Sequence, residues 1–236
     1  TYGSVNFVDP TGIQLVPNKT IIDAPASSAL AYINYQYKDD DMAQIEQTKK
    51  LPVTLLQDPV YLKRLDCLTT TLPEETKTVS IYSLGERDAL VWGNNKYLIL
   101  APTILLKKGT TSENLSTELL NHRLTLYYLS AEGDEDANTL KLYLRYEISG
   151  IGGSSTEETD DKESWASDYN VRYTNVSHVN LQPIISMYKS THSGSEPEKV
   201  TVEYEYNNST SSIPTIAKKQ TKTVTYNLYT ETSSNN

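Results

Sequence analysis

Residues 139–148 (TLKLYLRYEI) constrain the fold more than any other part of the sequence. Apolar side chains alternate there with charged or hydroxyl-bearing ones, which gives a strand one buried and one wet face, as in an antiparallel sheet. The same period of two recurs at residues 123–129, 199–206 and 221–229. Tyr and Thr both favour strands, and the chain holds 18 Tyr against 1 Phe. The sequence therefore predicts an all-β protein.

Shorter alternating runs and turn residues complete the predicted architecture. Short helices are expected between residues 39 and 49 and between residues 112 and 121, and residues 58–68 fit either a helix or a strand. Further strands are expected at residues 31–38, 78–84, 89–92, 97–100, 104–106, 170–174 and 181–188. About nine or ten strands suffice for a two-sheet, jelly-roll-like β-sandwich. We expect an N-terminal extended arm at residues 1–24 and a single β-sandwich domain at residues 25–236.

The predicted arm holds two apolar groups that are each too short for a helix. Pro10, Gly12 and Pro17 interrupt it, and no adjacent hairpin turn joins the two groups to a partner strand. Such an arm either folds back onto its own domain or adds a strand to a neighbouring molecule. The sequence pattern leaves both possibilities open.

Charge and motif content argue against several functional classes. A net charge of −9 is unsuited to binding nucleic acid, and no apolar run is long enough to span a bilayer. Cys67 is the only cysteine, and His122, His178 and His192 lie in unrelated contexts without metal-ligand or triad spacing. An acidic β-sandwich offers carboxylates for glycoside hydrolysis, but nothing in the sequence selects a pair. We expect a protein that is not an enzyme.

Three acidic clusters suggest a cation. Ca²⁺ takes about six to eight oxygen ligands, which carboxylates on neighbouring loops can supply. A solvated acidic loop is the alternative for each cluster, and none matches an EF-hand. The candidate Ca²⁺ ligands are Asp39, Asp40, Asp41, Asp134, Asp136, Asp160 and Asp161.

Tyrosines on the wet faces of predicted strands have more than one interpretation. Tyr143, Tyr204 and Tyr206 either fit strand geometry or line a contact surface, where Tyr is favoured. A sugar-binding platform would use the same residues. Five Asn-X-Ser/Thr sequons are close to the roughly three or four that chance gives, so they only permit glycosylation; they begin at Asn18, Asn114, Asn175, Asn207 and Asn208.

In overall character the chain resembles the cannula proteins of hyperthermophilic archaea, with the camelysin/TasA-type matrix fibre proteins as wider relatives. The matching features are the apolar N terminus from Val5 to Ile22, the run YINYQY at residues 32–37, the acidic residues 39–41 and the Tyr/Thr-rich strands. The resemblance implies an extracellular or cell-surface homopolymer, a filament or tube. Its subunits would join by donor-strand complementation, assisted by Ca²⁺. The resemblance implies that the donor-strand side chains are Val5, Phe7, Val8, Ile13 and Leu15.

We therefore expect a secreted structural subunit that polymerises through its arm and calcium, since a head-to-tail contact that does not close gives fibres or tubes. The alternatives are a viral capsid or tail β-sandwich protein and a carbohydrate-binding adhesin module.

Overall fold

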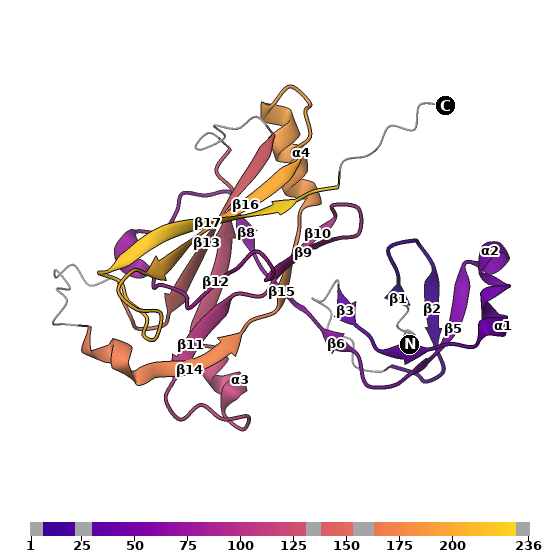
Figure 1. Ribbon diagram of the computed structural model, residues 1–236, viewed down its shortest axis with the longest axis horizontal. Coiled ribbons are helices and arrows are strands. Elements are labelled where there is room, and N and C mark those ends of the chain that lie inside the picture. Colours follow the sequence, from indigo (N-terminus) through magenta and orange to yellow (C-terminus); the bar gives the residue numbers. More distant parts are fainter. Residues whose placement is uncertain (1–6, 22–29, 131–137, 153–162, 230–236) are drawn as a thin grey trace. The chain divides into compact units, whose positions relative to one another are not determined.

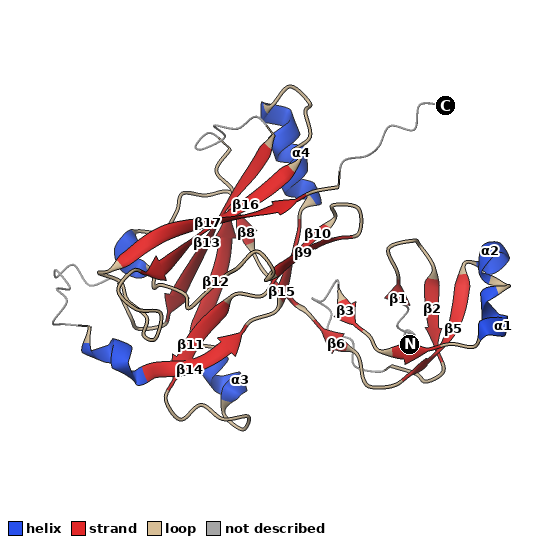
Figure 2. Cartoon of the chain, in the orientation of Figure 1, coloured by secondary structure: helices blue, strands red, loops and turns tan. Residues whose placement is uncertain are grey.

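The computed structural model describes residues 7–21, 30–130, 138–152 and 163–229. Strands dominate these residues and the helices are short (Figure 2), so the prediction of an all-β, sandwich-like fold is confirmed. Residue contacts divide the chain into two compact units: an N-terminal unit of residues 1–64 with 92–94, and a C-terminal unit of residues 65–91 with 95–236. The division therefore differs from the expected boundary after residue 24.

The N-terminal unit contains a four-stranded sheet in the order β1-β2-β5-β4 and a separate β3-β6 pair (Figure 1). Strands β1 and β2 are antiparallel, β2 and β5 are parallel, and β4 and β5 are antiparallel. The elements of this unit are β1 (Phe7–Val8), β2 (Gln14–Pro17), β3 (Ala31–Tyr32), β4 (Tyr35–Gln36), α1 (Asp39–Met42), α2 (Ile45–Thr48), β5 (Lys50–Leu55), β6 (Val60–Tyr61) and β7 (Lys63–Arg64).

The strands of the predicted arm belong to this sheet. Asp9 forms the turn between β1 and β2, because its Oδ1 accepts hydrogen bonds from the backbone N–H groups of Thr11 and Ile13, both at 2.9 Å. Gly12 completes the turn with φ of +85°, which glycine adopts without strain. A core of Leu15, Ile45, Leu51 and Val53 then closes the unit, with Phe7 and Ile13 packed against it. The arm thus pairs within its own chain.

The C-terminal unit is built on a five-stranded sheet in the order β17-β16-β13-β12-β8. β13 and β16 are parallel, which requires the long crossover that contains β14, β15 and α4. The elements are β8 (Cys67–Leu68), η1 (Glu75–Lys77), β9 (Ala89–Trp92), β10 (Tyr97–Leu100), β11 (Thr103–Lys107), α3 (Leu115–Leu119), β12 (His122–Tyr127), β13 (Thr139–Ile148), η3 (Ser164–Asp168), β14 (Tyr169–Thr174), β15 (Ser177–Asn180), α4 (Gln182–Thr191), β16 (Lys199–Asn207) and β17 (Lys219–Asn227).

One face of this sheet forms the core of the C-terminal unit. Leu140, Leu142 and Leu144 of β13 point into it and are almost completely buried. The antiparallel pairs β10–β15 and β11–β14 contribute to the same hydrophobic cluster. None of the helices in the described residues is long and apolar enough to cross a membrane.

Two predicted strands of this unit are wrong. Residues 78–84 form only isolated bridges, at Ile81 and Ser83. Residues 181–188 lie mostly in helix α4, whose first turn contains a proline and whose Ile184, Ile185 and Tyr188 are buried on one side. Pro183 suits the first turn, because the N–H that proline lacks has no intrahelical partner there.

Candidate functional site

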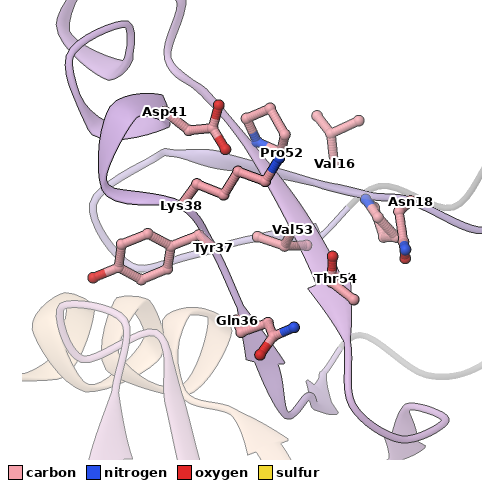
Figure 3. A pocket seen from close by; sticks show the side chains of 10 residues that line it. Val16, Asn18, Gln36, Tyr37, Lys38, Asp41, Pro52, Val53 and Thr54 are labelled. Carbon is pink, nitrogen blue, oxygen red and sulfur yellow. The ribbon is translucent and has the colours of Figure 1, made fainter.

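An open groove of about 460 Å³ lies on the outward face of the N-terminal sheet (Figure 3). Its floor comes from strand residues that alternate with the buried ones: Val16 of β2 is paired with Pro52 of β5, and both are exposed. The segment from β4 into α1 forms one side. The lining residues are Val16, Pro17, Asn18, Gln36, Tyr37, Lys38, Asp41, Pro52, Val53 and Thr54.

Neutral side chains give the groove both apolar and hydrogen-bonding character. Tyr37 is 47% exposed and stands at the edge of the groove, with its ring directed away from Val16, Pro52 and Asn18 (Figure 3). Asn18, Gln36 and Thr54 also line the groove. Their amide and hydroxyl groups can both donate and accept hydrogen bonds. The groove therefore combines an apolar floor and an aromatic residue at its edge with polar groups of both kinds.

Two opposite charges complete the lining. Helix α1 begins after Lys38, and Asp39, Asp40 and Asp41 occupy its first turn, where carboxylates are favoured by the helix dipole. The N–H of Asp41 donates to the carbonyl of Lys38 at 3.0 Å, which ties the two residues together. The groove thus presents one ammonium and one carboxylate group.

The predicted calcium site stays a prediction. Within the described part of the chain, no group of three or more His, Cys, Asp and Glu side chains is arranged to hold a metal ion. Asp39 and Asp40 are exposed in α1, and Asp41 is partly buried. The other candidates, Asp134, Asp136, Asp160 and Asp161, lie outside the described residues.

The described donor-strand residues lie in or beside the N-terminal sheet of their own chain. Leu15 is only 3% exposed, Phe7 and Ile13 pack against the same core, and Val8 is 58% exposed. Val5 lies outside the described residues. Strand donation was inferred from an arm without a partner strand. Because β2 pairs with β1 and β5 of its own chain, that reason for the inference does not hold. Polymerisation stays an untested prediction.

His122 occupies a buried array that its sequence context does not indicate. Its Nε2 lies 2.9 Å from Oε1 of Glu118, and its Nδ1 is hydrogen-bonded to the hydroxyl of Tyr146. Its side chain is 1% exposed. A substrate therefore has no direct access to this imidazole, and we interpret the array as an attachment of α3 to the sheet.

The Glu118–His122 contact predicts a pH-dependent contribution to stability. Burial raises the pKa of Glu118, but hydrogen bonds from His122 and from the N–H of Lys107 outweigh it, so the pKa is lower than in the unfolded chain. The contribution is thus complete above the unfolded pKa of about 4.5 and is lost as pH falls through the folded value. We expect Glu118→Gln to lower the free energy of unfolding by about 1 kcal/mol at neutral pH.

This difference should shrink as the pH falls below about 4.5, where the carboxylate of the unfolded chain becomes protonated, and should disappear once the pH is below the lowered pKa of Glu118 in the folded protein. Urea unfolding of both proteins at a series of pH values measures it. A difference that is independent of pH would contradict the role of the charged carboxylate. The nearby phenols do not interfere, because burial raises the pKa of Tyr146 and Tyr169 above the ordinary tyrosine value.

A second buried group of charges lies on the face of the C-terminal sheet opposite the core. Nη2 of Arg145 lies 2.8 Å from Oε1 of Glu203, and Nζ of Lys219 lies 3.1 Å from Oε1 of Glu205. Burial lowers the pKa of Lys219, although Glu205 acts in the opposite direction. Lys219 also donates to the carbonyls of Glu75 and Thr78, at 2.6 and 2.9 Å. These charges hold the unit together and are closed to ligands.

The wet-face tyrosines do not form an exposed platform. Tyr143 is 6% exposed and Tyr204 4%, and Tyr206 is partly buried. The tyrosine that does line a groove, Tyr37, is the last of an alternating run, directly before the Lys-Asp-Asp start of a helix. The sequence signal that could have indicated Tyr37 is an aromatic residue at the end of a predicted strand, directly before a polar segment.

No family model matches the sequence, and no curated protein is significantly similar to it. Solved structures do share the fold. A protein from Bacteroides fragilis, provisionally described as a lipoprotein, has a TM-score of 0.69 at 21% identity, over 97% of this chain and 94% of its own. A DUF1344 protein of unknown function from Bacteroides vulgatus has a TM-score of 0.52 at 13% identity, over 96% and 85%. A NigD-like immunity protein from Bacteroides caccae has 0.51 at 12% identity, over 92% and 87%.

These similarities correct the resemblance drawn from the sequence. The structural neighbours are bacterial proteins of these three kinds, so the assignment to archaeal cannula proteins or camelysin/TasA-type proteins is wrong. An apolar N terminus, an acidic cluster and Tyr-rich strands are common to many β proteins, because each follows from strand propensity or solvation. At these identities the similarities establish the fold alone.

Proposed function

We propose that this chain is a secreted or surface-associated carbohydrate-binding protein without catalytic activity, and that the N-terminal groove holds the sugar. The combination of exposed Tyr37 with amide, hydroxyl and charged side chains supports this most strongly. The description of the Bacteroides fragilis neighbour as a lipoprotein agrees with an exported location. An extracellular location is part of the proposal.

The ligand class follows from the chemistry of the lining. A sugar ring has an apolar C–H face and an edge of hydroxyl groups that both donate and accept hydrogen bonds. The exposed pair of Val16 and Pro52 offers apolar surface for the face at the floor of the groove, with Tyr37 at its edge. Asn18, Gln36 and Thr54 suit the hydroxyls. The groove volume of about 460 Å³ lies within the range of small-molecule sites, roughly 300–1,000 Å³.

Binding fits this groove better than glycoside hydrolysis. Hydrolysis ordinarily uses two carboxyl groups, about 5–10 Å apart, on either side of the scissile bond. Among the described residues that line the groove, Asp41 is the sole carboxylate, and it lies next to Lys38 at the start of α1. Asp41 is therefore assigned to hydrogen bonding with hydroxyl groups.

A polysaccharide array tests the proposal. The labelled full chain is applied to immobilised neutral, uronate-containing and amino-sugar polysaccharides, and we expect binding to at least one class. Tyr37→Ala should weaken that binding about tenfold or more, since about 1.4 kcal/mol of lost stacking and buried area corresponds to tenfold.

Tyr32→Ala is the matched control. Tyr32 is a more exposed tyrosine of the same unit, at 60%, and it does not line the groove. We expect its substitution to leave binding unchanged. Absence of binding to every polysaccharide, or equal losses in the two variants, would overturn the proposal.

A further inference from the structure

A second groove, of about 440 Å³, lies in the C-terminal unit where the paired strands β12 and β13 meet the α3–β12 connection. Leu120 and Asn121 of this connection line it, together with Arg123 of β12 and Glu147 of β13. Leu120 leaves 84% of its surface exposed, more than any other large hydrophobic residue in the described part of the chain. An exposed leucine at the rim of a groove is a candidate contact for a partner.

The backbone around Leu120 is held in place. The N–H of Leu120 donates to the carbonyl of Thr117 at 3.3 Å, and that of Asn121 to the carbonyl of Glu118 at 2.9 Å. The N–H of Ser149 then donates to the carbonyl of Asn121 at 2.8 Å, which joins the connection to the end of β13. Leu120 is thus presented on a fixed backbone, which reduces the conformational entropy lost on binding.

The buried Glu118–His122 contact also holds the α3–β12 connection in place. These two residues flank Leu120 and Asn121 in the sequence, and their side chains are 14% and 1% exposed. Oε1 of Glu118 also accepts a hydrogen bond from the N–H of Lys107 at 3.1 Å, which ties α3 to β11. Glu118 is therefore a positioning residue for Leu120.

The backbone of the opposite wall, which Lys77 and Gly152 form, is also fixed in position. Gly152 has φ of +79°, and a Cβ at this position would collide with the carbonyl oxygen of Thr76. Only glycine therefore lets residues 76–77 approach closely enough for Lys77 to line the groove. Lys77 pairs at 3.2 Å with Glu74, but both side chains are largely exposed, so the pair is weak and readily exchanged.

The charges in the groove indicate the partner. Arg123 and Lys77 line it with one carboxylate, Glu147, which lies directly opposite Arg123 in the β12–β13 pairing. This cationic pair occurs on a chain whose net charge is −9. A guanidinium binds carboxylates with two parallel hydrogen bonds, and arginine is enriched among residues that dominate protein interfaces.

From these observations we infer that the Leu120 groove docks an acidic segment of a partner protein. An apolar side chain of the segment packs on Leu120, and flanking carboxylates bind Arg123 and Lys77. The surface is separate from the proposed sugar groove, so either proposal can fail without the other.

The test uses the full chain and a fluorescein-labelled peptide in which leucines are flanked by Asp and Glu, with a Lys-for-acid analogue as the negative probe. We expect the acidic peptide to bind, more weakly at high salt, and the basic analogue not to bind. Leu120→Asp and Arg123→Glu should each weaken binding about tenfold or more.

Matched variants separate a specific site from general charge effects. Leu56→Asp replaces another exposed leucine, and Lys222→Glu reverses another exposed cation; neither residue lines the groove. Both should bind the acidic peptide like the parent protein. Glu118→Gln should give a smaller loss of affinity together with faster amide hydrogen exchange at residues 120–121.

Equal affinity of the parent, Leu120→Asp and Arg123→Glu proteins would overturn the proposal. Failure of the acidic peptide to bind would also overturn it. So would displacement of the peptide by heparin, an anionic polysaccharide, if heparin binds the protein more tightly than the peptide does.

Discussion

Replacing Arg145 with methionine is expected to destabilise the C-terminal unit by about 1.5–3 kcal/mol, because two largely buried carboxylates lose a charged partner. Within the described residues each keeps a single cation, Lys141 for Glu203 and Lys219 for Glu205. The Arg145 side chain is 7% exposed and contacts two carboxylates, with Nη2 2.8 Å from Glu203 and Nε 3.9 Å from Glu205. Oε2 of Glu205 already lacks a hydrogen-bond partner within the described residues. The substitution would leave both carboxylates in a largely dry environment with fewer cations.

Urea unfolding followed by Trp165 fluorescence measures this loss. A Trp92→Phe background restricts the signal to the C-terminal unit, since Trp165 is then the only tryptophan of the chain. Two comparisons identify the cause. Adding Glu203→Gln to Arg145→Met should recover part of the stability, because Glu203 loses its 2.8 Å contact and its remaining partner, Lys141, is less buried. Lys189→Met, which breaks an exposed pair with Glu196, should cost at most about 1 kcal/mol. Equal effects of Arg145→Met and Lys189→Met would contradict the buried-charge explanation.

Leu15→Ala is expected to destabilise the N-terminal unit by about 2–5 kcal/mol, the usual cost of truncating a buried leucine. Leu15 is 3% exposed, pairs in register with Leu51 of β5, and belongs to a core of only four buried residues in the described part of this unit. A core this small has few other contacts to compensate for a cavity. Hydrogen exchange at residues 50–55 should therefore become much faster.

Val16→Ala is the matched control for Leu15→Ala. Val16 is the next residue of β2 and its side chain is 36% exposed, so its truncation should change stability by no more than about 0.5 kcal/mol. If β2 were a strand reserved for another molecule, Leu15→Ala would not change exchange at residues 50–55 of the dilute protein. That result would restore the case for strand donation.

The long strands were predictable because their periodicity extends over many residues. Residues 139–148 form β13 with the predicted bounds, and β16 and β17 differ from expectation by one or two residues at their ends. Helix α4 was missed because Leu181 to Tyr188 contains β-branched and aromatic residues that are equally suited to a strand. The helix follows instead from Pro183 in the first turn and from the spacing of Ile184 and Tyr188.

The hairpin of β1 and β2 was missed because its turn residues were considered only as breaks in the apolar pattern. Pro10 and Gly12 interrupt this pattern, and the sequence alone predicts no hairpin turn between the two apolar groups. Asp at the first position of a turn, Pro at the second and Gly at the fourth are typical of a β-turn, and Asp9 makes the expected side-chain hydrogen bonds. The parallel pairing of β2 with β5 joins residues far apart in the sequence, so no local pattern could indicate it.

The candidate sites depend on such long-range pairing. Val16, Tyr37 and Pro52 come from three separate segments and share a groove only because β2, β5 and β4 are neighbours in one sheet. The contact between Glu118 and His122 was accessible in principle, because a separation of four residues is a common pairing distance at the end of a helix. The burial of this pair could not be predicted from the local sequence, because it depends on contacts with Lys107 of β11 and Tyr146 of β13.

Heteronuclear NMR of the full chain, titrated with the soluble oligosaccharide that corresponds to the strongest array signal, is the most direct test of the proposed function. We predict saturable chemical-shift changes concentrated at the amides of Val16, Tyr37 and Thr54, and their loss in Tyr37→Ala but not in Tyr32→Ala. Shift changes centred on another surface, or an unaltered titration in Tyr37→Ala, would contradict the assignment of this groove as the sugar-binding site.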